Sequence, residues 1–461
     1  MTNFWEFNVW GCVVLAGALL GSMLLGHAIK RMTPGLRESL IPTSVIGGLI
    51  LLVVSEIYRA VTGAELFNTE LFGGNGLAAL EIITYHCLAL GFIASTFKSS
   101  SGKLGKKRST EIFNTGVTTV STYLMQGILG LAITMIAAKI VSGFFGPAGI
   151  LLPFGYGQGT GQAMNYGTIY ETQFGFVGGK SFGLTIAALG FLSASIGGVI
   201  YLNVKRKRGT LKISSEKRER YTAEDIQKEN EIPMQESIDK MTIQVGLVIF
   251  AYILAYGIMY VLGMLLPGMK NVIFGFNFLI GVLAATIVKV FISGFKKTKM
   301  MHHEYINNFL MTRVSNFFFD VMVVAGIAAI SLGLLEDYWG IIIILAIVGM
   351  GSTFLYERFV AKKLFSEYYE EQFLMMYGML TGTASTGTIL LREIDGEFKT
   401  PAADNMVYQN FPAIVFGFPM MLLATMAPVK PLMTLIILIA FFAVMNIILF
   451  RSIIFKKKSK G

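Results

Sequence analysis

Two short stretches of the chain combine glycine with small polar side chains. The first, at 157–162, reads Gly-Gln-Gly-Thr-Gly-Gln, and the second, at 381–388, reads Thr-Gly-Thr-Ala-Ser-Thr-Gly-Thr. Glycine lets backbone amides and carbonyls approach a ligand closely. Hydroxyl and carbonyl oxygens suit a hard cation such as sodium, and the free N–H groups at a helix N-terminus attract a carboxylate. The pattern predicts reversible binding of an ion and a small polar solute.

The candidate substrate-binding residues of the first stretch carry neutral amides, a hydroxyl or no side chain: Gly157, Gln158, Gly159, Thr160, Gly161, Gln162 and Asn165. Those of the second stretch are Thr383, Ser385 and Thr386. Arg392 follows them and could pair with a substrate carboxylate. It could equally anchor a helix end by snorkelling or pair with Glu393 or Asp395.

Candidate sodium ligands are three hydroxyls of the second stretch and one acid that lies inside an apolar segment: Thr381, Thr383, Thr386 and Asp320. An intramembrane acid is a functional candidate by default. A structural partner such as Arg313 explains Asp320 equally well. No cofactor other than the coupling ion is expected.

The elements that hold these residues are predicted to be membrane-spanning helices. Of the 461 residues, 54% are hydrophobic and 14% are charged, against about 25% charged in soluble domains. Apolar runs long enough to cross a bilayer, about 20 residues, recur along the chain. We expect eleven spans, at 8–28, 42–61, 77–97, 114–138, 176–203, 243–266, 272–294, 314–334, 338–360, 406–426 and 431–453.

The basic residues that give the chain its formal net charge of +10 are distributed according to the topology of these spans. Lysine and arginine concentrate after the first, third, fifth, seventh and ninth spans and in the tail, so the positive-inside rule places the N-terminus outside and the C-terminus in the cytoplasm. This distribution makes a nucleic-acid partner unnecessary.

The chain divides into two comparable halves. We predict an N-terminal repeat at 1–203, a charged cytoplasmic linker at 204–240, a C-terminal repeat at 241–428 and an extra helix with a basic tail at 429–461. Each repeat has five spans, and an interruption at 143–168 or 371–391 falls between its fourth and fifth spans. An odd number of spans per repeat implies inverted repeats, and matching interruptions indicate a binding site.

Both interruptions are expected to be re-entrant hairpins, because irregular backbone at membrane depth must be buried in protein or line a cavity. Close helix packing through small residues is the simpler alternative. A nucleotide loop would need a strand and a βαβ unit, which the sequence lacks. No metal-ligand spacing and no pairing of nucleophile and base is evident, so we expect a protein that is not an enzyme.

The same motifs carry a family resemblance. GQGTGQA followed by YETQFGF, IPTSVIGGLI at 41–50, and YGMLTGTASTG resemble motifs of the bacterial sodium/glutamate symporter family, in corresponding positions from about 8 to 426. The resemblance implies a dimer in the bacterial inner membrane that imports glutamate with sodium by an elevator-like movement. The chain departs from the family at Gln158, where the family has histidine, and at Ser385, where it has proline.

The expected protein is therefore an all-α, inverted-repeat, sodium-coupled symporter for glutamate or a related small carboxylate. Its expected partners are that anion, sodium, the lipid bilayer and a second copy of the chain. A symporter for another organic anion is the first alternative, and an ion channel built on the same hairpins is the second.

Overall fold

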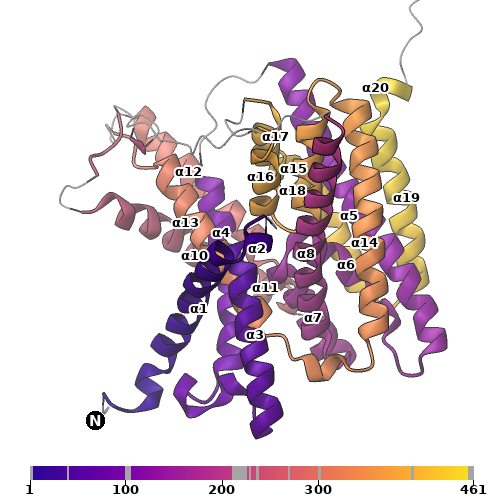
Figure 1. Ribbon diagram of the computed structural model, residues 1–461. Helices are drawn as coiled ribbons and strands as arrows, with labels where there is room; N and C mark the ends of the chain where they lie inside the picture. The colour runs from indigo at the N-terminus through magenta and orange to yellow at the C-terminus, as the bar shows by residue number, and fades with distance from the viewer. Residues whose placement is uncertain are drawn as a thin grey trace, which may run out of the picture. The chain divides into compact units, whose positions relative to one another are not determined.

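The computed structural model describes residues 4–38, 41–98, 105–209, 226–227, 230–234, 238–267, 270–298, 303–395 and 399–454. These residues form helices and no strand (Figure 1). Most of the linker at 204–240 lies outside the described residues.

Ten described helices are long and apolar enough to cross a membrane. They are α1 (Phe7–Met32), α3 (Thr43–Thr62), α4 (Gly76–Phe97), α5 (Lys106–Ile140), α8 (Gly179–Lys207), α10 (Lys240–Leu265), α12 (Asn277–Lys297), α13 (Asn308–Ala328), α14 (Trp339–Leu364) and α19 (Pro431–Leu449). An eleventh candidate span is a pair, α17 (Ala402–Tyr408) and α18 (Asn410–Met426), bent by 50°. The prediction of a polytopic all-α membrane protein is confirmed. The bend in the tenth span was not predicted.

The remaining described helices are short or broken. They are α2 (Pro34–Glu38), η1 (Leu66–Asn68), η2 (Glu70–Phe72), η3 (Gly146–Ile150), α6 (Leu151–Gln158), α7 (Thr160–Phe174), α11 (Lys270–Gly275), η5 (Leu332–Leu335), α15 (Tyr369–Thr381), α16 (Ala384–Arg392) and α20 (Arg451–Ile454). Four of these, α6, α7, α15 and α16, fall on the two predicted interruptions.

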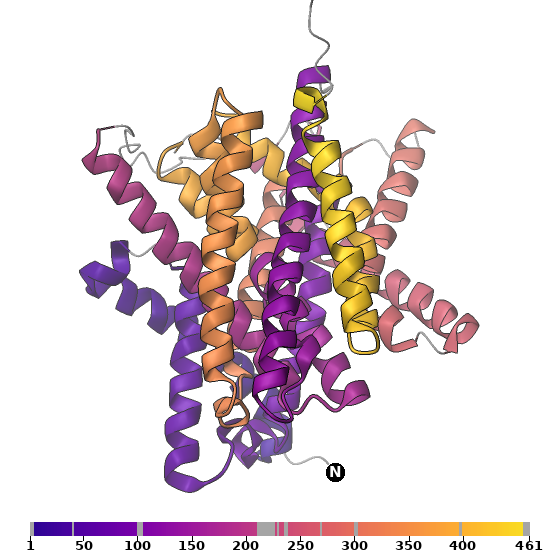
Figure 2. The ribbon, with the colours of Figure 1, turned by 90° about the vertical axis from the view of Figure 1, so that its right-hand side faces the viewer.

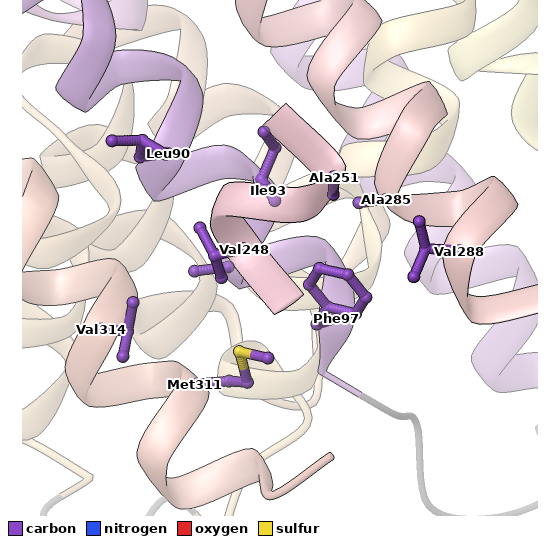
Figure 3. Packing of buried hydrophobic residues seen from close by; sticks show 10 residues of the cluster. Leu90, Ile93, Phe97, Val248, Ala251, Ala285, Val288, Met311 and Val314 are labelled. Carbon is purple, nitrogen blue, oxygen red and sulfur yellow. The ribbon is translucent and has the colours of Figure 1, made fainter. Parts of the chain in front are cut away.

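The chain forms two compact units. Unit 2 comprises Leu77–Lys103 and Arg218–Ala325, and therefore holds α4, α10, α12 and most of α13. A buried apolar cluster fills its centre, where Phe97 of α4, Val248 of α10 and Met311 of α13 converge (Figure 3). Lys289 of α12 donates to the carbonyl oxygens of Thr96 and Lys98 at 2.8 and 3.0 Å. It therefore satisfies carbonyls at the C-terminal end of α4.

Unit 1 comprises Met1–Gly76, Leu104–Lys217 and Gly326–Gly461. It contains both glycine-rich stretches, together with the long helices α5, α8 and α14. In Figure 2, the yellow α19 lies along the purple α5. The predicted extra helix therefore packs on this unit through α5.

Candidate functional site

The first glycine-rich stretch breaks a helix. α6 ends at Gln158 and α7 begins at Thr160, and Gly159 between them has φ +81° and ψ −172°. This backbone region is open essentially to glycine alone. The rings of Phe154 in α6 and Tyr166 in α7 stack with centroids 4.0 Å apart, so the two arms fold back beside each other. We call Leu151–Phe174 the first broken segment.

The second glycine-rich stretch also breaks a helix. α15 ends at Thr381, α16 begins at Ala384, and Gly382 and Thr383 connect them. A Cβ built on Gly378 would lie 2.8 Å from the Cα of Gly387. The two arms therefore touch at their backbones, which only glycine permits. We call Tyr369–Arg392 the second broken segment; its limits differ by one or two residues from the predicted interruption.

Helix α8 contacts both broken segments through one face. Gly183, Gly190 and Gly197 recur at intervals of seven residues, a spacing that keeps them on the same side of a helix. A Cβ on Gly183 would lie 2.4 Å from the carbonyl oxygen of Ala163 in the first segment. A Cβ on Gly190 would lie 2.4 Å from that of Thr381 in the second. The glycines of α8 thus bring the two segments to one helix.

Ser193 of α8 joins the segments by hydrogen bonds as well. Its hydroxyl bonds the phenol oxygen of Tyr156, from α6, at 2.9 Å. Its carbonyl accepts from the phenol of Tyr377, from α15, at 2.8 Å. Tyr156 also donates to the carbonyl of Ala346 in α14 at 2.8 Å. Neither tyrosine was predicted as a site residue, because in an apolar helix the sequence does not distinguish these aromatic rings from ordinary packing residues.

The predicted residues of the first segment lie together around its break. Thr160, Gln162 and Asn165 are buried at 0%, 1% and 8% exposure; Gly159 and Gly161 are buried, and Gly157 and Gln158 are half-buried. The side-chain oxygen of Gln162 accepts from the amide of Asn165 at 3.2 Å. The Nε2 group of Gln162 has no acceptor among the described residues. A buried amide in this state is a ready donor for a ligand.

The predicted hydroxyls of the second segment are placed at its break. Thr381 and Thr386 are fully buried, and Thr383 is half-buried. The hydroxyl of Thr381 donates to the carbonyl of Tyr377 at 2.6 Å, which leaves its lone pairs available. The Oγ1 atoms of Thr383 and Thr386 are 3.5 Å apart. The side chain of Ser385 lies outside the described residues.

Two predicted residues are not part of either break. Arg392 is the last residue of α16 and is exposed, about 12 Å along the helix from Ala384 at 1.5 Å per residue. Asp320 is half-buried on α13 and belongs to unit 2. Their roles stay predictions.

A polar contact between α5 and α14 adds residues that the sequence analysis had not selected as ligands. The Nε2 of Gln126 donates to Thr353 Oγ1 at 2.8 Å and to the carbonyl of Leu380 at 2.9 Å. One turn away, Thr122 Oγ1 lies 2.5 Å from Glu357 Oε1. Leu380 directly precedes the break of the second segment, so α5 holds that break in place.

The bend between α17 and α18 is also bound to α5. Gln409, at the bend, accepts at Oε1 from Thr119 of α5 at 2.9 Å. Asn405, one turn earlier, donates to Gln372 Oε1 of α15 at 3.0 Å, and Gln372 donates to Thr115 Oγ1 of α5 at 3.1 Å. These amides and hydroxyls continue the polar face of α5 beyond Gln126. A run of threonines in an apolar helix is the sequence signal that could have revealed it.

The far end of the second segment carries an ion pair. Lys205 Nζ of α8 lies 2.5 Å from Glu370 Oε1 of α15, with side-chain exposures of 14% and 11%. The phenol of Tyr201 donates to the other carboxylate oxygen. Arg358 of α14 lies over the Tyr201 ring, 5.4 Å from its centroid. This cluster fixes the start of α15 to α8 and α14.

Comparison of the chain with protein-family models and with curated proteins finds no match. The donors assembled around the two breaks are neutral amides, hydroxyls and backbone groups. Within the described ranges, no three His, Cys, Asp or Glu side chains cluster as a metal site. The arrangement can bind a monovalent cation through oxygens and an anion through N–H groups.

Proposed function

We propose that the chain is a sodium-coupled secondary transporter of a small carboxylate, with glutamate as the first candidate. The observation that carries the proposal is the meeting of two broken helical segments at one glycine face of α8. Interrupted helices in both halves of a polytopic chain are the usual sign of a transporter binding site.

The chemistry at the breaks supports an anion together with a cation. α7 begins at Thr160 and α16 at Ala384, and the first N–H groups of a helix attract a carboxylate. The buried Nε2 of Gln162 adds a neutral donor. The hydroxyls of Thr383 and Thr386 and the carbonyls that end α15 offer oxygens for sodium. A bound cation would lower the electrostatic cost of admitting the anion.

The proposal includes the wider organisation expected from the sequence. The broken segments act as re-entrant hairpins of two inverted repeats, and alternating access is elevator-like. The protein is a homodimer in the bacterial inner membrane, with its N-terminus outside. The positive-inside distribution and the resemblance to sodium/glutamate symporters support these points.

A symporter for a different small organic anion is the second candidate. The described donors at the breaks are neutral, and Arg392, the cationic candidate, is exposed at the far end of α16. A site of this kind recognises a carboxylate through N–H groups, and its donors do not specify the chemical nature of the rest of the substrate.

The test is uptake of labelled glutamate by proteoliposomes that contain the full chain. Uptake driven by external sodium should collapse when potassium or choline replaces sodium. Equal uptake in all three media would overturn sodium coupling. Currents far above carrier turnover would indicate a channel, and sodium-driven uptake of other organic acids in place of glutamate would select the second candidate.

A matched pair of variants tests the assignment of sodium to the second break. Thr386→Val removes a fully buried hydroxyl at the break, and we expect it to abolish stabilisation of the purified protein by sodium. Thr388→Val is the control, because it removes a hydroxyl from the same helix about one turn beyond the break. Equal sodium stabilisation in the two variants would move the ion site elsewhere.

A further inference from the structure

A buried carboxyl outside the two breaks lies between α5 and α14. Glu357 has 1% exposure, and its Oε1 atom is 2.5 Å from Thr122 Oγ1. Four residues before it, Thr353 accepts from Gln126, which is four residues after Thr122. The two contacts therefore form neighbouring rungs between helices, one turn apart. We call these four residues the α5–α14 ladder.

The two contacts of Thr122 indicate where the proton of the first rung lies. Its Oγ1 atom lies 2.9 Å from the carbonyl oxygen of Thr118 as well as 2.5 Å from Glu357. A hydroxyl has one proton to donate, and a carbonyl can only accept. The neutral acid gives each contact a proton of its own, with Thr122 donating to Thr118 and Glu357 donating to Thr122, whereas an ionised carboxylate would have to share the one hydroxyl proton with the Thr118 carbonyl. The contacts therefore favour a carboxyl that carries a proton and is neutral.

The negative charge of an ionised Glu357 would be poorly compensated by hydrogen-bond donors or cations at this position. Among the described residues, Thr122 is the one donor found at the Glu357 carboxyl group, and none of the ion pairs found there includes it. A buried charge with a single neutral partner is strongly unfavourable. The neutral acid satisfies the same geometry without that cost.

None of the ion pairs found among the described residues joins Glu357 to a charged group of α14 or of the helices packed against it. On α5, Arg108 pairs with Glu111 and Lys107 with Glu367. On α8, Lys180 pairs with Glu171 and Lys205 with Glu370. Exposed helix ends hold Lys106, Lys139, Arg206 and Lys207. The remaining titratable groups on α5, α6, α8 and α15 are five tyrosines and one acid: Tyr123, Tyr156, Tyr201, Tyr369, Tyr377 and Glu371. Those on α14 itself, besides Glu357, are Tyr356, Arg358, Lys362 and Lys363.

The second rung of the ladder connects this carboxyl to the proposed binding site. Gln126 donates to Thr353 and also to the carbonyl of Leu380, at 2.9 Å, just before the break of the second segment. The Oε1 atom of Gln126 has no donor in the part of the chain that the structure describes. Separation of α5 from α14 would therefore disturb the break directly.

We propose that Glu357 is a proton-binding site that the transporter loads when α5 and α14 pack as described and unloads to water when they separate. Loading forms the O–H bond of the acid, and unloading returns the proton to the solvent and leaves a hydrated carboxylate. The proton is thus a second coupling ion, bound apart from the oxygens at the breaks. The loading cycle rests on the proposed transport function; the protonation of Glu357 does not.

Infrared spectroscopy of the full chain in lipid tests the protonation. At neutral pH, the difference between wild type and Glu357→Gln should show loss of one carboxylic-acid carbonyl band. Glu370→Gln is the matched control, because its carboxylate is paired with Lys205, and it should remove a carboxylate band instead. Loss of a carboxylate band in Glu357→Gln would overturn the proposal. Glutamine can donate to Thr122 as the neutral acid does, so failure of this variant to fold would also count against it.

Transport at varied pH tests the loading. Sodium-driven glutamate uptake by wild-type proteoliposomes should depend on pH through one titrating group, and Glu357→Gln should lose that dependence. Identical pH profiles in the two proteins would overturn the role in coupling. Absence of uptake in wild type would refute the proposed function, and the infrared result would still decide whether Glu357 holds a proton.

Discussion

Substitution of Gly190 by alanine tests whether α8 holds the second break by backbone contact. The added Cβ would lie 2.4 Å from the carbonyl oxygen of Thr381 and 3.1 Å from Tyr156 Cδ2. One of the elements must then move by about 1 Å to restore an ordinary contact. Since the closest atom belongs to the backbone of α15, no side-chain rotation can relieve the overlap.

The expected cost follows from two opposing terms. Overpacking a well-filled interior costs about 1–3 kcal/mol, and replacing a mid-helix glycine by alanine returns about 0.5–1 kcal/mol. We expect Gly190→Ala to lose up to about 2.5 kcal/mol of folding free energy. The displaced break should also weaken stabilisation by sodium.

Gly351→Ala is the matched control. Gly351 is inside α14, in the same unit, and nothing lies within 4 Å of its added Cβ. Gly351→Ala should therefore gain the stability that alanine gives a helix interior, without the steric overlap expected for Gly190→Ala. Thermal unfolding of the purified proteins, with and without sodium, measures both effects. If the two variants unfold at the same temperature with the same sodium response, the close approach of α8 to Thr381 is refuted.

Two further substitutions test how the segments are held. Gly159→Ala forces alanine into a backbone region that only glycine tolerates and should cost about 1–3 kcal/mol of folding free energy. Gly17→Ala is its control, because the added Cβ contacts nothing within 4 Å. Equal thermal midpoints for the two variants would contradict the backbone conformation described at Gly159. Lys205→Met leaves the carboxylate of Glu370 without its cation and should destabilise the fold. Adding Glu370→Gln should recover part of that loss, with a coupling of about 0.5–3 kcal/mol between the sites, whereas strictly additive midpoints would show that the pair contributes nothing.

The long helices could be predicted because bilayer thickness imposes a length that the apolar runs display directly. The breaks could be predicted too, because glycine together with small polar side chains interrupts the apolar sequence around Gly159 and Gly382. The bend at Gln409 was not predicted, although the sequence carries a signal for it. Pro412 has no N–H to bond the carbonyl of Tyr408, and its ring clashes with that carbonyl, which favours a helix break between them. The bond of Gln409 to Thr119 of α5, by contrast, joins residues far apart in the chain and could not be predicted.

Glu357 shows why the candidate site was only partly predictable. It lies in the sequence Tyr-Glu-Arg, close to two lysines, and this context resembles the charged inner end of a span. Its burial comes from the packing of α14 against α5, which periodicity within one helix does not specify. The heptad of glycines in α8 was visible in the sequence, but the carbonyls of Ala163 and Thr381 that face it come from other elements.

The contacts in unit 1 limit how alternating access could work in the proposed transporter. Gly183 and Gly190 bind α8 to both segments at backbone distance, and Gly130 of α5 meets the carbonyl of Gly149 in η3 in the same way. Interfaces this close cannot slide by a few ångströms without overlap, since protein interiors are close-packed. α16 is held in the same way, because a Cβ on Gly387 would lie 2.6 Å from the carbonyl oxygen of Met375 in α15. Movement of α5–α8, α15 and α16 as one body is therefore the mechanism that these contacts favour.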